Sequence, residues 1–187
     1  MNIGYYGHGS MIRNEFIYEL DIELDMDYIT NLVTKKQDES VNGRASHHRM
    51  VCDDPYMMSI KNRYPLLSDV YNIYPLPAYC EIPLHIDSSR SCAFNLPIQG
   101  TEGTYTVFYE EAGPLKLEYD EKRIYDLVKS PVNEVFRSTL IRPLLINNTI
   151  PHEVINHKNT MRLTLSWSLN LNVTYQQAIE CFDAQIL

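Results

Sequence analysis

The sequence predicts a mainly β fold, a double-stranded β-helix (jelly-roll) core with helices packed outside it. From residue 69 to residue 169 the chain is a series of short β-prone runs separated by Pro, Gly and Asn, and helix-like patterns occur only before and after it. Many short strands at such spacing are typical of an all-β sandwich or barrel. A chain of 187 residues is long enough for one domain with a sizeable core. We therefore expect a single domain over 1–187, with a supporting N-terminal part at 1–68, a β core at 69–170 and a C-terminal helix at 172–187.

The N-terminal part contains one strand-like and one helix-like pattern. Residues 15–25 partly alternate apolar and polar side chains, which indicates an early strand. Asp25 or Asp27 can cap a short helix that continues through Val33. The tract from Lys35 to Arg49 has almost no apolar side chains and predicts a surface loop. Because the connection from Lys35 to Met50 is longer than most, we expect it to cover the functional site.

A second helix and the β core follow. Asp54-Pro55 begins a helix over 56–64, with proline at an early helical position. After residue 172 the pattern is again helical, with Thr174 as the expected cap. The expected strands of the core are 70–74, 78–87, 91–98, 104–109, 115–119, 124–128, 136–140, 144–146, 152–155 and 161–169.

Composition excludes several classes of protein. The formal net charge is −8, so the chain lacks the electropositive footprint of a general nucleic-acid binder. No apolar run has the length of a signal-peptide core or a membrane span, and we expect a cytoplasmic protein with no membrane partner. The four cysteines are far apart and show no Cys-x-x-Cys spacing, which argues against a zinc knot or a redox motif.

The motif around which the chain is organised is Leu84-His85-Ile86-Asp87. Residues two apart on a strand point to the same face, so His85 and Asp87 can both coordinate one cation. His152, in the stretch Pro151-His152-Glu153-Val154, is the best candidate for a third ligand. Two histidines and one carboxylate form the facial triad that suits non-haem Fe(II), because it leaves positions open for other ligands.

The last strand of the core carries a candidate anion-binding group. The polar segment 155–160 is expected to turn an antiparallel hairpin, which would place the strand of His152 beside the strand of Arg162. Arg162, Thr164 and Ser166 share one face of that strand. A guanidinium pointing into a barrel interior needs a partner, and a bound carboxylate would supply one. The alternative is a structural ion pair, for example with Glu153.

The set His85-x-Asp87, His152 and Arg162-x-Thr164 resembles the Fe(II)/2-oxoglutarate-dependent dioxygenases. In that family the Arg and the hydroxyl residue hold the distal carboxylate of 2-oxoglutarate. The stretches 85–90 and 94–98 look most like the aspartyl/asparaginyl β-hydroxylase branch, which includes free-proline hydroxylases. The resemblance covers 79–169. It implies a cupin-like core and a metal bound by His85, Asp87 and His152. It also implies hydroxylation of an amino-acid, peptide or protein side chain, with O2 consumed and succinate and CO2 released.

Further residues have two interpretations each. Arg90 holds either a second carboxylate of the co-substrate or substrate, or an acid in a surface salt bridge. Asn95 and Tyr79 either line the co-substrate pocket or are ordinary strand residues. His152 can also be a core histidine. Ser166 is expected to add a hydroxyl donor beside Arg162.

Two other functional classes remain open from the sequence. One is a non-catalytic cupin-like protein that binds a metal or ligand, and the other is a metal-dependent hydrolase that uses zinc-bound water. Arg162 with Thr164 is the discriminating feature, because hydrolysis requires no dicarboxylate clamp beside the metal.

Overall fold

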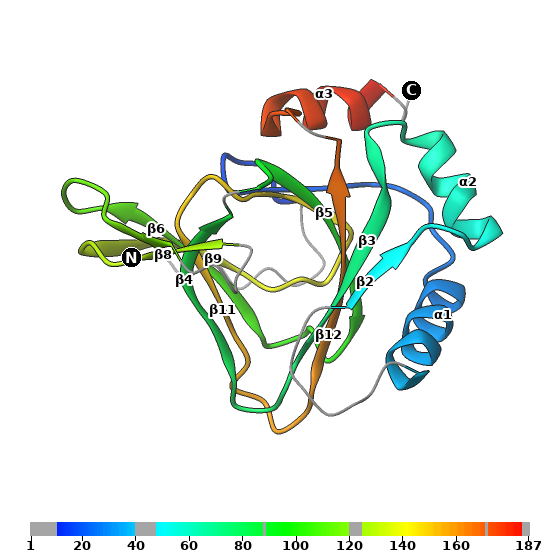
Figure 1. The fold of residues 1–187 in the computed structure, drawn as a ribbon, viewed down its shortest axis with the longest axis horizontal. Helices are drawn as coiled ribbons and strands as arrows, with labels where there is room; N and C mark the ends of the chain where they lie inside the picture. The colour runs from blue at the N-terminus through cyan, green and yellow to red at the C-terminus, as the bar shows by residue number, and fades with distance from the viewer. Residues whose placement is uncertain (1–10, 40–47, 88, 120–124, 171, 185–187) are drawn as a thin grey trace.

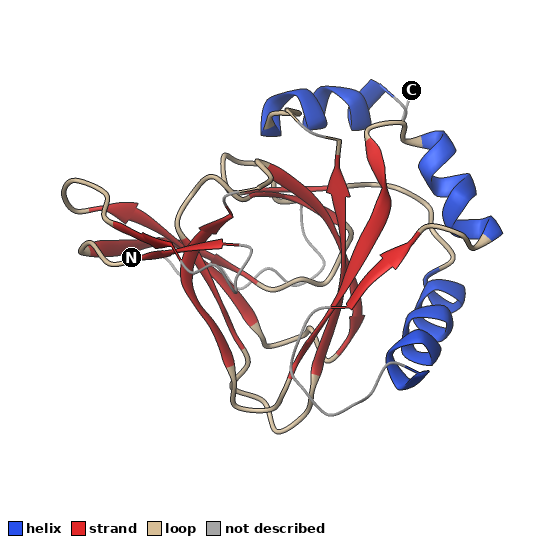
Figure 2. Cartoon of the chain, in the orientation of Figure 1, coloured by secondary structure: helices blue, strands red, loops and turns tan. Residues whose placement is uncertain are grey.

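The computed structural model describes residues 11–39, 48–87, 89–119, 125–170 and 172–184. These residues form three helices and twelve strands, and the fold is mainly β as predicted (Figure 2). The elements in chain order are β1 (Ile17–Glu19), α1 (Met26–Glu39), β2 (His48–Val51), α2 (Pro55–Arg63), β3 (Leu67–Leu76), β4 (Glu81–Asp87), β5 (Cys92–Gln99), β6 (Tyr105–Glu111), β7 (Leu117–Tyr119), β8 (Tyr125–Val128), β9 (Val132–Ser138), β10 (Leu144–Asn147), β11 (His152–Ile155), β12 (Arg162–Leu169) and α3 (Tyr175–Ala184).

The strands form two antiparallel six-stranded sheets. The first sheet has the order β1-β10-β5-β12-β3-β2, and the second has the order β7-β8-β4-β11-β6-β9. Eight of these strands make the core, with β3, β12, β5 and β10 adjacent in the first sheet and β4, β11, β6 and β9 adjacent in the second. Successive core strands alternate between the sheets except at the β6–β9 pair, which is the winding of a double-stranded β-helix. The predicted jelly-roll core is therefore confirmed.

The predicted hairpin between the last two core strands is wrong. β11 pairs with β4 and β6, whereas β12 pairs with β3 and β5, so the two strands lie in different sheets. The buried amide of Asn156 holds the corner between them, since its Nδ2 donates to the carbonyls of Leu76 at 3.1 Å, Pro77 at 2.9 Å and Thr160 at 2.9 Å. The polar segment turns the chain from one sheet to the other rather than back onto its neighbour.

The helices cover the first sheet (Figure 1). The second helix begins at Asp54-Pro55 as predicted, and Asp54 caps it, because its Oδ1 accepts from the backbone N–H groups of Tyr56 and Met57. At α3, the Thr174 hydroxyl accepts from the Gln177 backbone N–H while the Gln177 side chain accepts from the Thr174 backbone N–H, which is a capping box. Among the described residues, none of the helices is both long and apolar enough to cross a membrane.

Two predictions for the N-terminal part need correction. The first helix does not end near Val33 but continues to Glu39, and His48–Val51 forms the edge strand β2. The predicted surface loop is therefore helix at its start and strand at its end. Its middle, residues 40–47, lies outside the described residues. The expected early strand is shortened to Ile17–Glu19, which pairs with β10 along its length and bridges to Arg13 at Tyr18.

The two faces of β12 separate the apolar core from the barrel interior. Leu163, Leu165 and Trp167 are fully buried and pack in the cluster that joins the first sheet to the helices, where the Trp167 indole N–H also donates to the Ser68 carbonyl at 2.8 Å. A second apolar cluster, which includes Phe108 and Ile146, lies between the sheets. The alternate residues of β12 consequently face the interior, as their spacing predicted.

Candidate metal and anion site

The two histidines lie side by side on the second sheet. His152 on β11 is directly opposite His85 on β4, and their ring centroids are 4.3 Å apart. Asp87 is two residues along β4 on the same face. All three side chains are buried, whereas Leu84 and Ile86, which alternate with them, are only half-buried. The face-sharing predicted from the His-x-Asp spacing is therefore confirmed.

Both imidazoles are held in the tautomer that a metal ligand requires. His85 Nδ1 lies 2.7 Å from the Pro83 carbonyl and His152 Nδ1 lies 2.9 Å from the Ile150 carbonyl. A carbonyl can only accept, so each Nδ1 carries the proton and each Nε2 keeps its lone pair. Burial lowers the pKa of His85 to about 3, and it lowers the pKa of His152 as well. Both rings are therefore neutral at physiological pH, which is the form that binds metal.

Arg90 holds the carboxylate of Asp87 in place. Asp87 Oδ2 accepts from Arg90 Nε at 2.8 Å, while Asp87 Oδ1 lies 3.8 Å from His85 Nε2. The terminal nitrogens of Arg90 reach the Ser166 hydroxyl at 3.0 Å and the Tyr74 hydroxyl at 3.4 Å on the first sheet. Arg90 is thus a largely buried bridge between the sheets. Neither the surface salt bridge nor the free clamp for a ligand carboxylate describes it.

The donor set fits a divalent transition metal in its chemistry. Two Nε2 lone pairs and one carboxylate oxygen face the same interior space. In the described part of the chain, no three or more His, Cys, Asp or Glu side chains are already close enough to be assigned as a metal site. The triad therefore stays a prediction, supported by the tautomers, the burial and the shared face of the three side chains.

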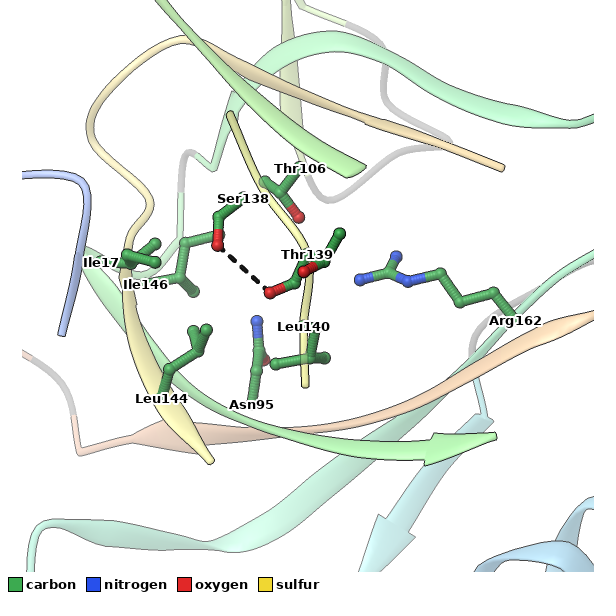
Figure 3. A pocket seen from close by; sticks show the side chains of 9 residues that line it. All are labelled: Ile17, Asn95, Thr106, Ser138, Thr139, Leu140, Leu144, Ile146 and Arg162. Carbon is green, nitrogen blue, oxygen red and sulfur yellow. Dashed lines mark hydrogen bonds between the residues drawn. The ribbon is translucent and has the colours of Figure 1, made fainter. Parts of the chain in front are cut away.

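Arg162 projects into a small cavity between the sheets (Figure 3). The cavity has a free volume of about 10 Å³, which is room for one water-sized group. Ser138 and Thr139 lie opposite the guanidinium, and Thr106 and Asn95 flank it (Figure 3). The apolar remainder of the lining is Ile17, Leu140, Leu144 and Ile146.

The guanidinium of Arg162 has no acidic partner among the described residues. Its burial alone lowers its pKa from 12.5 to about 10. Arg162 Nε, Thr164 Oγ1 and Asn95 Oδ1 are buried without a hydrogen-bond partner in the described part of the structure. Glu153, the alternative partner, instead accepts from the Tyr109 hydroxyl. The Arg162 N–H and the Thr164 hydroxyl are buried donors that are costly to leave unpaired, and a bound carboxylate would accept from both, whereas Asn95 Oδ1 is itself an acceptor.

The strand register places this cavity one residue row from the histidines. Phe108 on β6 is opposite His152, and Thr106, two residues before it, is opposite Ser138 on β9. Thr106 and Ser138 line the cavity. Two residues along a strand span about 7 Å. The site thus offers a place for a negatively charged group about 7 Å from the row of His85 and His152, which is the span of a short dicarboxylate.

The structure changes the role of some predicted residues and adds others. Tyr79 does not line the pocket, because it lies at the β3–β4 corner with a 72 % exposed side chain and a left-handed backbone (φ 58°). Ser166 accepts from Arg90 and so supports Asp87 rather than the anion cavity. Sequence reasoning missed Tyr125, whose ring centroid is 4.3 Å from that of His85. It also missed the hydroxyls that line the cavity, which no motif marks.

Comparisons with known proteins bear on the fold. No family model and no curated protein matches the sequence. The crystal structure of AviO1 from Streptomyces viridochromogenes Tue57 matches 87 % of this chain and 92 % of its own, at 10 % identity and a TM-score of 0.53. It shares the fold. A prolyl-4-hydroxylase from Pseudomonas putida matches 84 % and 88 % of the two chains at 13 % identity, with a TM-score of 0.45. A cupin domain from Bordetella pertussis Tohama I matches 70 % and 99 % at 18 % identity, with a TM-score of 0.24.

Proposed function

We propose that this protein is an Fe(II)- and 2-oxoglutarate-dependent oxygenase that hydroxylates a C–H bond of an amino-acid or peptide side chain. The observation that carries the proposal is the buried, acid-free guanidinium of Arg162, one residue row from two neutral histidines and a carboxylate. A hydrolase has no use for an anion receptor at this position. The resemblance of the same residues to the dioxygenase family supports the assignment.

Each residue has a role that its contacts define. His85 and His152 would hold Fe(II) through Nε2, and Asp87 would hold it through Oδ1, since Oδ2 belongs to Arg90. Fe(II) bound with 2-oxoglutarate and O2 supplies the oxidant for hydroxylation, with release of succinate and CO2. The apolar residues between the sheets, Phe108 and Ile146 among them, exclude water. Exclusion of water strengthens every charge interaction in the site.

Arg162 selects the co-substrate in this proposal. Its fork of N–H donors matches a carboxylate, and the unpaired Thr164 hydroxyl lies on the same interior face as a further donor. The free volume beside the guanidinium is about 10 Å³, room for one water-sized group, so a carboxylate end group requires the lining side chains to move apart and a whole dicarboxylate does not fit. We infer that the distal carboxylate enters this cavity and that the 2-oxo acid end extends toward the histidine row.

An anaerobic titration tests the function. Fe(II) is added to the protein, then 2-oxoglutarate, and the weak visible charge-transfer band of the chelate is followed. The expected result is a saturable band that is absent at the same 2-oxoglutarate concentration in Arg162→Met. A wild-type protein that binds Fe(II) but shows no band and forms no succinate in air would exclude the oxygenase and favour the metal-binding or hydrolase class.

A further inference from the structure

A second, larger hollow lies at the other end of β12. Its volume is about 210 Å³, and it is formed by the β4–β5 connection and by the chain between β12 and α3. This volume is below the roughly 300–1,000 Å³ of typical small-molecule pockets, so it suits a group the size of one amino-acid residue. Asp87 forms part of its wall, which brings the hollow to the proposed metal ligands.

The hollow and the anion cavity are separate places along one strand. Arg162 begins β12 and Leu169, which lines the hollow, ends it, so about 23 Å of strand lies between them. Ser166 lies between these two residues and contacts Arg90, which contacts Asp87. A co-substrate anchored at Arg162 therefore leaves the hollow free, with the proposed metal ligands between the two.

The charges around the hollow are already balanced. Asp87 and Arg90 are the two charged residues among those that line it, and they pair with each other. All three guanidinium nitrogens of Arg90 donate to an acceptor within the protein. An incoming anion would meet the Asp87 carboxylate without finding a free cation. A cation would compete with Arg90 for Asp87 at the expense of that buried pair.

The rest of the lining is uncharged and mixed: Cys92, Leu169 and Val173 form an apolar part, and four polar residues supply hydrogen-bonding groups. Ser89 and Ser91 contribute hydroxyls, and Asn170 and Asn172 contribute amides. Asn170 Nδ2 donates to the Pro65 carbonyl at 3.1 Å, so its amide oxygen is the group left for a ligand. Hydroxyl and amide groups both donate and accept hydrogen bonds, which suits a ligand that does the same.

We propose that this hollow is the substrate subsite and that it receives a neutral polar residue, one whose side chain both donates and accepts hydrogen bonds. That the ligand of the hollow is a substrate rests on the proposed function, but binding of the residue itself requires neither metal nor 2-oxoglutarate. Charged residues of either sign are expected to bind less well, because Asp87 and Arg90 already neutralise each other. Purely apolar residues are expected to bind less well, because they leave the hydroxyls and amides of the hollow unpaired.

Asn172 offers a clean perturbation of the subsite. Its φ is 70°, in the left-handed region that glycine also adopts without strain. Asn172→Gly therefore removes the amide and keeps the backbone. Tyr79 is a matched control, since it is also left-handed (φ 58°) and exposed but lies at the remote β3–β4 corner. Ser91→Ala removes a second hydrogen-bonding group from the hollow.

The experiment compares three capped residues of similar size on the metal-free protein: N-acetyl N-methylamides of glutamine, glutamate and methionine. Binding is followed by ¹H–¹⁵N NMR. We expect the glutamine probe to shift the backbone signals of Ser91 and Asn172 saturably, with the other two probes about tenfold weaker. Loss of one neutral hydrogen bond in Asn172→Gly or Ser91→Ala should weaken the glutamine probe about fivefold, with Tyr79→Gly unchanged.

Three results would overturn the inference: a glutamate or methionine probe that binds as tightly as glutamine, signals that shift elsewhere, or no binding of any probe at millimolar concentration. The Fe(II) and 2-oxoglutarate titration fails or succeeds independently. If the probes bind as expected and that titration shows no band, the hollow is a binding site on a protein that is not this oxygenase.

Discussion

Replacing Arg162 by methionine should stabilise the metal-free protein while weakening co-substrate binding at least about a hundredfold. Arg162 is 6 % exposed, and its guanidinium has no acidic partner among the described residues. Burial lowers its pKa from 12.5 to about 10, which corresponds to about 3 kcal/mol of unfavourable free energy for the charged form. An unbranched apolar side chain of similar length removes this cost. We expect the free energy of unfolding to rise by about 1–3 kcal/mol.

The unfavourable free energy of burying the charged guanidinium is offset when a carboxylate binds beside it. Losing a charge-assisted contact of about 3 kcal/mol weakens binding by about a hundredfold. Arg162→Met should therefore reduce 2-oxoglutarate affinity at least that much and leave Fe(II) affinity nearly unchanged. Arg162→Lys keeps the charge, loses the fork, and should recover binding only in part.

Urea denaturation of the metal-free protein and anaerobic titration of the Fe(II) form measure the two effects. Arg137→Met is the control, because that exposed guanidinium pairs with Glu134 on the surface and its loss should change stability by less than about 1 kcal/mol. If Arg162→Met lowered stability and bound 2-oxoglutarate like the parent, Arg162 would be a structural residue and the assignment of the co-substrate would be wrong.

Three further predictions concern the proposed metal ligands and the β5–β6 connection. Arg90→Met should weaken Fe(II) binding about tenfold, because Asp87 loses the contact that orients it, and Arg90→Lys should recover part of the lost affinity. Equal Fe(II) affinity of the parent and both variants by calorimetry would contradict this role of Arg90. Because folding lowers the pKa of His85 from its ordinary value of 6.5 to about 3, the unfolded chain takes up more protons than the folded protein below pH 6.5. His85 should therefore lower the free energy of unfolding of the metal-free protein by about 2 kcal/mol when the pH falls from 7.5 to 5. In urea unfolding, the His85→Gln variant should lose about 2 kcal/mol less than the parent over the same pH range. Gly100→Ala should lower the free energy of unfolding by several kcal/mol and Gly103→Ala by about 1 kcal/mol, as measured by thermal or urea unfolding. Both glycines have positive φ, but a Cβ on Gly100 would meet the Met161 backbone, whereas one on Gly103 would meet only the flexible Lys158 side chain. Equal losses of stability would refute the clash at Gly100.

Local sequence patterns determined which side chains share a face. The alternation of β12 separated Arg162, Thr164 and Ser166 from Leu163, Leu165 and Trp167, and the spacing of His85 and Asp87 put both on one face of β4. These results need only the two-residue period of a strand, which each segment carries within itself. The same holds for Asp54 and Thr174, whose capping depends on residues two or three positions away.

Only the tertiary structure decided which strands are neighbours and which polar groups meet. The segment after His152 looks like a hairpin turn, yet β11 pairs with β4 and β6 and β12 pairs with β3 and β5, and Asn156 at the corner bonds to carbonyls about eighty residues earlier. Arg90 reaches Asp87 locally, but its contacts with Ser166 and Tyr74 depend on the packing of the two sheets. Tyr79 is adjacent in sequence to the site strand and remote from the site in space. Register and sheet membership follow from long-range pairing and burial, which compete across the whole chain, so no local pattern contains them.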